Sequence, residues 1–438
     1  MLSPKKRIEV LDALRRGTVP QDGLDVLAVG LERFRQPIDE ELQRAADGGC
    51  GFKAVRGEYG CGKTFFSRWL QQEARGLNFA TAEVQISETE TPLHKLETVY
   101  RRMMERLATT SSRSGAFRGI VDGWFYALEE DVISSGKIDP NDEQALITAT
   151  GELMERRLDA ISIKAPSFSA ALRAYRECLA NGESAMAEGL IAWLSGQPNV
   201  AAAVKKRANI KGDVDHFTAL SFLQGLLTVL KDSGHPGLVL VLDEVETLQR
   251  VRSDAREKGL NALRQLIDEL DGGVFPGLYL VITGTPSFFD GPQGLKKSPP
   301  LAQRLHTDFE TDSRFDNARA PQIRLNAFNH EMLLEVGRKV RDIYADGSKD
   351  SGRMLQLADD ALIQSLARGV AGSLGSKTGI APRIFLKKLV ADLLDRIEDH
   401  PSFNPLSDYR LTIREEELSM EERNLMAASS VDDISLKL

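Results

Sequence analysis

The chain has 438 residues, of which 42% are hydrophobic and 27% are charged, and its formal net charge is −8 at pH 7. This composition is ordinary for a globular protein with one large core or two smaller ones, and the negative charge argues against a strongly basic nucleic-acid-binding coat. No apolar run is as long as a membrane span, the N-terminal residues do not form a signal peptide, and the three cysteines follow no metal or disulfide pattern. We therefore expect a cytoplasmic protein.

Two amphipathic helices are predicted before the first strand, because apolar residues recur at helical spacing in residues 5–17 and again in residues 31–46. A strand is predicted at residues 52–55, directly before the most informative motif of the chain. A second strand is predicted at residues 80–86, where apolar and polar residues alternate.

The motif fits G-x-x-x-x-G-K-[ST], the phosphate-binding P-loop. Glycines let the backbone fold around a phosphate group with no Cβ in the way. Lys63 is expected to reach the β- and γ-phosphates of ATP, and the Thr64 hydroxyl is expected to bind Mg²⁺. The helix predicted at residues 64–71 would point its N-terminus at the phosphates, which makes a chance glycine-rich turn a weak alternative. The nucleotide-binding residues expected here are Gly57, Glu58, Tyr59, Gly60, Cys61, Gly62, Lys63, Thr64 and Phe65.

The interval from about residue 95 to residue 235 is predicted to be mostly helical and to contain an insertion. Trp124, Phe125, Tyr126 and Trp193 are expected to form its hydrophobic core, with a binding surface as the alternative. The predicted helices are residues 96–107, 117–130, 143–161, 168–180, 185–193 and 217–231.

A second motif supplies the acids that a P-loop site needs. Residues 237–242 form a continuous apolar run, as in a strand buried on both faces of a parallel sheet, and the run ends in Asp243 and Glu244. Asp243 is expected to hold Mg²⁺, directly or through water, and Glu244 to orient and polarise the attacking water. The alternative is a buried strand that ends in solvated acids.

A third strand is predicted at residues 278–282 and ends in a Thr-Gly-Thr-Pro turn. Thr283 is the first choice for a side chain that senses the γ-phosphate or helps to place the water, and Thr285 is the second. An ordinary turn without such a role is the alternative.

The order of P-loop, Asp-Glu strand, threonine strand and a G-x-x-P-R helix start at Pro382-Arg383 resembles the AAA+ ATPases. The resemblance implies that Arg383 is the sensor 2 arginine, which contacts the γ-phosphate from a helical lid. It also implies an arginine finger before the last core strand, which is predicted at residues 322–325. Arg304 is the best match for this finger, followed by Arg314 and Arg319. Without the resemblance, Arg383 would be read as a surface or capping arginine and Arg304 as a charged position on an amphipathic helix.

In origin-recognition-like and signalling members of these ATPases, an entry segment with Gly-Arg before an acid holds the adenine. This chain keeps Gly30 but has Leu31 in place of the arginine. The resemblance therefore implies that Val29, Gly30 and Phe34 lie near the adenine.

Four segments together, residues 7–20, 57–66, 83–87 and 237–246, resemble the ATP-binding proteins of bacterial BREX phage-defence systems, the BrxD group. This resemblance implies an ATPase in a multi-protein antiviral system that works with a helicase-like partner on DNA.

We accordingly expect an α/β fold with an AAA+ P-loop core, ATP and Mg²⁺ as ligands, and self-association or association with related ATPase subunits. The alternative is a nucleotide-gated scaffold with slow turnover and no direct DNA contact. A third reading, direct DNA translocation, depends on Lys205-Lys206-Arg207 with Lys211 and on Lys296-Lys297. The predicted segments are residues 1–46 (N-terminal, adenine side), 47–330 (core with the insertion at about 95–235), 331–400 (lid) and 401–438 (tail).

Overall fold

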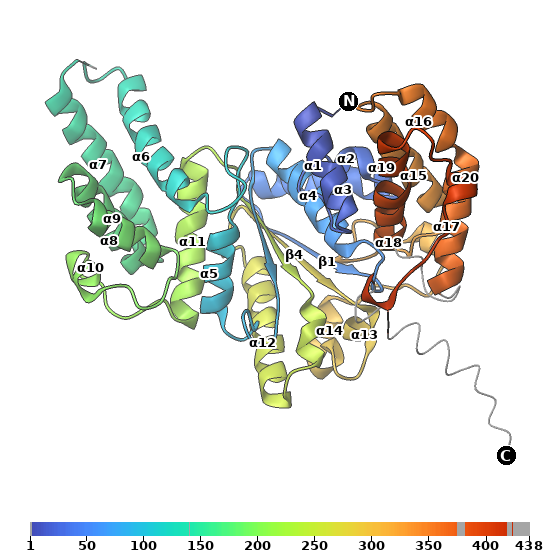
Figure 1. Ribbon diagram of the computed structural model, residues 1–438. Helices are drawn as coiled ribbons and strands as arrows, with labels where there is room; N and C mark the ends of the chain where they lie inside the picture. The colour runs from blue at the N-terminus through green and yellow to red at the C-terminus, as the bar shows by residue number, and fades with distance from the viewer. Residues whose placement is uncertain (1, 140, 375–381, 418–422, 424–438) are drawn as a thin grey trace.

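The computed structural model describes residues 2–139, 141–374, 382–417 and 423. Its centre is a five-stranded parallel sheet with the order β2-β3-β4-β1-β5 (Figure 1). This confirms the predicted parallel α/β sheet, and every predicted strand lies within two residues of its expected bounds. The strands are β1 (Gly51–Arg56), β2 (Ala80–Gln85), β3 (Leu238–Asp243), β4 (Leu278–Gly284) and β5 (Gln322–Arg324).

The sheet is covered by helices on both faces, which explains the continuous apolar sequence of β3. Its leucines pack into the cluster that contains α5, α11 and α12, whereas its valines pack into the cluster that contains α3 and α4. Alternate side chains of a strand point to opposite faces, so both sets are buried. The bounds of these helices are α3 (Glu32–Ala46), α4 (Lys63–Gly76), α5 (Leu96–Arg106), α11 (His216–Asp232) and α12 (Ser253–Asp271).

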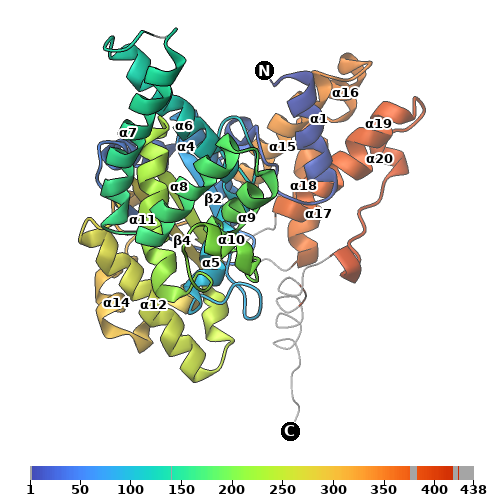
Figure 2. The same ribbon diagram turned by 90° about the vertical axis from the view of Figure 1, so that its left-hand side faces the viewer.

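The helices between α5 and α11 extend to one side of the sheet, as Figures 1 and 2 show. Trp124 and Trp193 are buried in their hydrophobic core, as predicted. The prediction was wrong for Tyr126, which is 64% exposed and donates its hydroxyl proton to Glu130. These helices are α6 (Phe117–Ser134), α7 (Glu143–Ser162), α8 (Pro166–Ala180), α9 (Ser184–Leu194) and α10 (Ala202–Arg207).

A second group of helices lies on the opposite side of the sheet (Figure 1) and has its own hydrophobic cluster. The N-terminal helix α1 (Pro4–Arg15) belongs to this cluster, and Arg15 forms an ion pair with Asp395 at 2.7 Å. The first 46 residues are thus divided, because α3 packs on the sheet instead. The other members are α15 (His330–Ala345), α16 (Ser351–Leu357), α17 (Asp360–Leu374), α18 (Pro382–Lys387), the π-helical η4 (Lys388–Leu394) and α19 (Asp395–Asp399).

The remaining elements are short. None of the described helices combines the length and apolar character that crossing a membrane would require. The remaining bounds are α2 (Leu24–Leu27), η1 (Val245–Gln249), α13 (Pro286–Asp290), η2 (Leu295–Lys297), α14 (Pro299–Arg304), η3 (Ser313–Phe315), α20 (Pro405–Asp408) and η5 (Glu415–Glu417).

Candidate functional site

The P-loop connects the end of β1 to the start of α4. Gly60 and Gly62 have φ values of 77° and 95°, a left-handed conformation that side chains with a Cβ rarely adopt. A Cβ on Gly57 would meet the Cys61 sulfur and approach the Leu325 carbonyl oxygen at 3.2 Å. The glycine positions of the motif are therefore required by the backbone of the loop.

The Lys63 side chain is folded back onto the loop. Its Nζ donates to the carbonyl oxygens of Gly57 at 2.9 Å and Glu58 at 3.2 Å, and it lies 5.1 Å from the centre of the Tyr59 ring. The ammonium group is thus held by two backbone carbonyl oxygens of the P-loop itself.

The ends of β3 and β4 bring the predicted acid and the predicted threonine together. Since β4 lies between β1 and β3, Thr283 lies between the P-loop strand and Asp243. The Thr283 hydroxyl donates to Asp243 Oδ1, and the Thr64 hydroxyl donates to Asp243 Oδ2 at 3.4 Å. Burial raises the pKa of Asp243 above its usual value, while the Thr283 hydrogen bond acts in the opposite direction. Thr283 is fully buried, so in this structure it orients the acid and does not line the cavity.

Glu244 has a φ of 61°, which is uncommon for a residue with a Cβ. Its backbone N–H donates to the Thr283 hydroxyl at 3.1 Å, and its carboxylate accepts a hydrogen bond from Gln85 Nε2 at 3.0 Å. Gln85 was not among the predicted site residues. The available signal was its position at the end of β2, since the C-terminal ends of parallel strands lie at one edge of a sheet.

Glu246 is a third acid at the same edge. It is only 3% exposed, and neither carboxylate oxygen has a hydrogen-bond partner among the described residues. Burial raises its pKa from 4.5 to about 7, although the Lys63 charge acts in the opposite direction. The sequence analysis missed this residue, although it lies two positions after Glu244.

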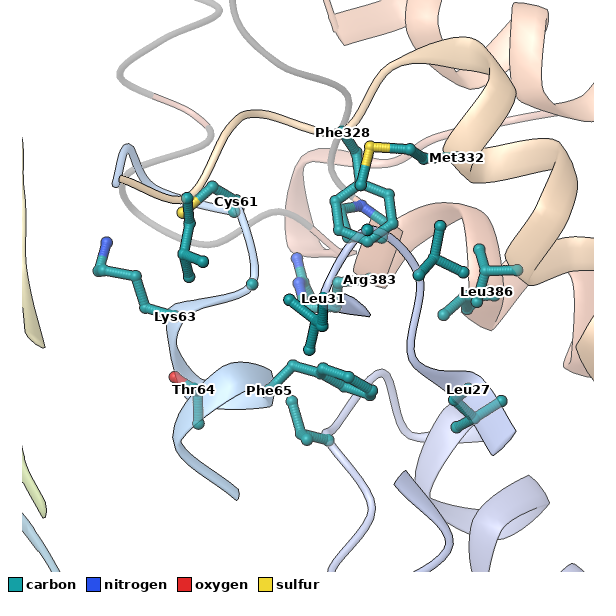
Figure 3. Close-up of a pocket in the computed structure, with 18 of the residues that line it drawn as sticks. Leu27, Leu31, Cys61, Lys63, Thr64, Phe65, Phe328, Met332, Arg383 and Leu386 are labelled. Atoms are coloured by element: carbon teal, nitrogen blue, oxygen red, sulfur yellow. The ribbon is translucent and has the colours of Figure 1, made fainter. Parts of the chain in front are cut away.

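The P-loop and the three acids Asp243, Glu244 and Glu246 line one cavity of about 520 Å³, whose other wall is apolar. Gly30 lies on this wall with a φ of 72°, where a Cβ would approach the Met332 methyl group at 2.8 Å. Val29 and Phe34 also line the cavity, as the adenine prediction requires. Leu27, Phe328, Met332 and Leu386 were not predicted as site residues, because they come from other parts of the chain. The apolar side chains that Figure 3 labels are Leu27, Leu31, Phe65, Phe328, Met332 and Leu386.

Arg383 enters the cavity from the start of α18 (Figure 3). Its Nη2 donates to the Glu417 carbonyl oxygen at 2.8 Å. Residues 379–381 of the predicted G-x-x-P-R motif lie outside the described residues. The structure thus brings Arg383 to the P-loop cavity, and its role toward a γ-phosphate stays a prediction.

The candidates for an arginine finger do not line this cavity. Arg304 at the end of α14 pairs with Asp268 of α12, Arg314 with Asp312 at 2.8 Å, and Arg319 with Glu40 at 2.9 Å. Thr285 also lies outside the lining, and its hydroxyl lies 3.0 Å from the hydroxyl of Ser287.

The basic cluster on α10 is partly neutralised. Lys205 pairs with Asp213 at 2.6 Å, and Arg207 pairs with Glu177 at 2.9 Å and Glu183 at 3.2 Å. These pairs weaken the argument for DNA contact at this position.

The residues present fit a nucleoside triphosphate with Mg²⁺. The glycine loop leaves space for phosphate groups, and the apolar wall suits a base. The described residues contain no group of three or more histidine, cysteine or acidic side chains that could hold a metal ion, but Mg²⁺ usually takes only one or two protein ligands and keeps several waters. Thr64 and Asp243 would serve in this way.

The chain was compared with known proteins. No curated protein matches it. The family model of the BREX system ATP-binding proteins BrxC/D matches residues 2–413. The match confirms the resemblance found in the sequence and agrees with the P-loop cavity. The chain belongs to the family of BREX system ATP-binding proteins BrxC/D.

Proposed function

We propose that this chain is a Mg²⁺-dependent ATPase with an AAA+ core. The observation that carries the proposal is the convergence of the P-loop, Asp243 and Glu244 on one cavity that also has an apolar wall. ATP would supply the γ-phosphoryl group, and Mg²⁺ would neutralise charge on the phosphates.

Each of these side chains would have its own role in binding or hydrolysis. Lys63 and the loop amides bind and orient the phosphates, while Thr64 and Asp243 hold the metal. Glu244 takes a proton from the water as it attacks, which requires that its carboxylate leave Gln85 or share the hydrogen bond. Thr283 fixes Asp243 and the Glu244 backbone relative to each other. Arg383 reads the γ-phosphate.

The Glu244→Gln variant tests this proposal. The substitution keeps the size of the side chain but removes its negative charge, so ATP binding should persist while hydrolysis falls by roughly two to four orders of magnitude. The measurements are phosphate release at steady state and ATP affinity by calorimetry. Glu257→Gln, an exposed position on α12, is the matched control and should retain the wild-type rate. An unchanged rate in Glu244→Gln would rule out the proposed base.

A second candidate function is a nucleotide-gated scaffold that turns over slowly. The observation that favours it is that Gln85 donates to Glu244 while the loop carbonyls accept from Lys63, contacts that would have to be exchanged before hydrolysis. Turnover measured with and without DNA, and with the neighbouring defence proteins, separates the two functions. A rate that stays very low under every condition would favour the scaffold.

The family match supports action within a BREX defence system. We infer from it that the ATPase works in an assembly, either with copies of itself or with related ATPase subunits, and with a helicase-like partner on DNA. Arg304 would then complete the site of a neighbouring subunit. Direct DNA contact through Lys206, Lys211 or Lys296-Lys297 and a cytoplasmic location stay predictions.

A further inference from the structure

A second cavity, of about 460 Å³, lies beside the outer edge of β2, and we name it the arginine cavity. Five arginines from three parts of the chain line it: Arg68 and Arg75 from α4, Arg102 and Arg106 from α5, and Arg113 from the loop after α5. Both helices pack against β2, which is an edge strand of the sheet (Figure 2). The guanidinium groups of segments that are distant in the sequence therefore line one cavity.

The lining has a clear excess of positive charge. Against the five arginines it contains two acids, Glu83 and Glu90. The whole chain has a net charge of −8, so this local excess runs against the overall composition. Glu9, Asp22 and Glu105 lie outside the lining and offset part of this excess, because Glu105 pairs with Arg102 while Glu9 and Asp22 pair with Arg113.

Three of the arginines are incompletely paired. Among the described residues, no carboxylate is recorded within 4.0 Å of the exposed Arg106 side chain. Arg75 is half-buried, and its nearest recorded acid, Asp22, is 3.7 Å away. Burial lowers the pKa of Arg75, and Asp22 offsets this only in part. Arg68 lies 3.4 Å from Glu83. Since a guanidinium carries five N–H donors, these three retain capacity for an anion.

The other two arginines are better paired and hold the wall of the cavity in place. Arg102 forms ion pairs with Glu90 at 3.0 Å and with Glu105 at 2.9 Å, and Arg113 pairs with Asp22 at 2.8 Å. The cavity thus combines a fixed ionic wall with guanidinium groups whose donors are not all used.

The rest of the lining defines the chemistry of the ligand. Among the described residues that line it, Ala108 is the only apolar one and none is aromatic, so these residues offer a base or hydrocarbon chain little surface to pack against. Hydroxyl groups of Ser87, Thr89 and Ser114 supply neutral donors. Guanidinium groups with such donors match the oxygens of phosphate groups, which they bind in a bidentate manner.

We propose that the arginine cavity binds a small ligand that carries two or more phosphate groups. Its volume is close to that of the P-loop cavity, and its incompletely paired arginines come from both α4 and α5, so more than one phosphate is needed to meet them. A strand of nucleic acid is disfavoured, because sequence-independent strand binding uses aromatic side chains on which the bases stack. This site goes beyond the proposed ATPase function.

The test is calorimetry with inorganic tripolyphosphate at low ionic strength, performed on the full-length Lys63→Ala protein. That substitution removes the P-loop lysine, so remaining binding reports on the arginine cavity. Adding Arg106→Gln, a change at an exposed side chain with no recorded ion pair among the described residues, should weaken binding about tenfold, and adding Arg75→Gln should weaken it further. The matched control is Arg101→Gln, because Arg101 lies beside Arg102 on α5 but outside the cavity lining. This variant should bind tripolyphosphate as tightly as the Lys63→Ala protein.

Two further titrations identify the source of the phosphates. If ATP and CTP bind with the same affinity as tripolyphosphate, the cavity recognises the phosphate chain itself. If one of the two nucleotides binds more tightly, a nucleotide is the natural source of the phosphates. An oligothymidine strand that binds more tightly than tripolyphosphate would overturn the assignment to a small ligand. The arginines would form only a structural ion network if tripolyphosphate did not bind to folded Lys63→Ala protein. The same would follow if Arg106→Gln and Arg101→Gln weakened its binding equally. These outcomes are distinct from the ATPase test, because Glu244 is intact in every variant.

Discussion

The P-loop cavity and the arginine cavity have similar volumes, about 520 and about 460 Å³, but their walls differ. The P-loop cavity has an apolar wall, a glycine loop and the unpaired acid Glu246, whereas the arginine cavity has ionic and hydroxyl groups on nearly every side. Gln85 belongs to both regions, since it lines the arginine cavity while its amide donates to Glu244. The ligand of each cavity is therefore indicated by the chemical groups of its wall and not by its volume.

Changes at the P-loop cavity and at the proposed arginine finger sharpen this comparison, because each should leave tripolyphosphate binding at the arginine cavity unchanged. The largest effect is expected for Arg304→Ala. If Arg304 acts as a finger in a neighbouring subunit, its loss should lower the ATPase rate by about 10³-fold or more, with ATP affinity largely retained.

Asp268→Ala is the control for Arg304→Ala, because it breaks the same ion pair but keeps the arginine. Mixing Arg304→Ala with Glu244→Gln should restore part of the activity, since one subunit keeps its base and borrows Arg304 from the other. No recovery in mixed oligomers, or full activity of a monomer, would exclude a finger in trans.

Thr283→Val should have the next largest effect. The substitution keeps the volume but removes the hydroxyl that joins Asp243 to the Glu244 backbone. Misplacement of these groups should lower kcat by roughly 10- to 100-fold, with a smaller change in ATP affinity. Thr285→Val, whose hydroxyl contacts Ser287 instead, should behave like the wild type. An equal decrease in both variants would contradict a specific role for Thr283.

Arg383→Ala should reduce the preference for ATP over ADP by about tenfold, because only ATP offers a γ-phosphate to its guanidinium. The measurement is the affinity of each nucleotide in the same buffer. Lys387→Ala is the matched control, since Lys387 lies on the same helix and also contacts the Glu417 segment, at 3.7 Å, but does not line the cavity. Equal loss of affinity for ATP and ADP would mean that Arg383 does not read the γ-phosphate.

The smallest effect is expected for the stability of the nucleotide-free Glu246→Gln variant. The folded-state pKa of Glu246 is raised from 4.5 to about 7, so its contribution to stability is fully present below about pH 4.5 and is lost as the pH rises through about 7. The glutamine variant lacks this loss and should melt a few °C above the wild type at pH 8, while the two should converge near pH 5. A difference in melting temperature that is the same at both pH values would contradict the buried, unpaired carboxylate.

Local patterns predicted much of the fold and part of the site. The strands were found because their apolar runs and alternation are local, and the P-loop and the Asp243-Glu244 strand end were found because each is a local motif of its own. The long helix α12 was not anticipated, although Leu263, Ile267 and Leu270 recur at helical spacing and are buried.

The other groups of the site depend on tertiary structure. Phe328 and Met332 reach the cavity because α15 begins beside the P-loop, and Gln85 reaches Glu244 because β2 pairs with β3. No local period encodes such pairings. The predicted role of Thr283 toward a γ-phosphate or water stays a prediction, and its contact with Asp243 follows only from the position of β4 between β1 and β3.

The most direct test of the central claim is the ATP affinity of the Lys63→Ala protein relative to the wild type, measured by calorimetry with Mg²⁺. Lys63 is the P-loop cation expected to bridge two phosphate groups, so its removal should weaken ATP binding at the P-loop cavity by about 100-fold or more while the melting temperature stays close to that of the wild type. Adding Arg106→Gln to both proteins weakens binding at the arginine cavity equally, so the difference in ATP affinity between them reports on the P-loop cavity. Near-normal ATP affinity in a folded Lys63→Ala, Arg106→Gln protein would contradict the assignment of this cavity as the ATP site.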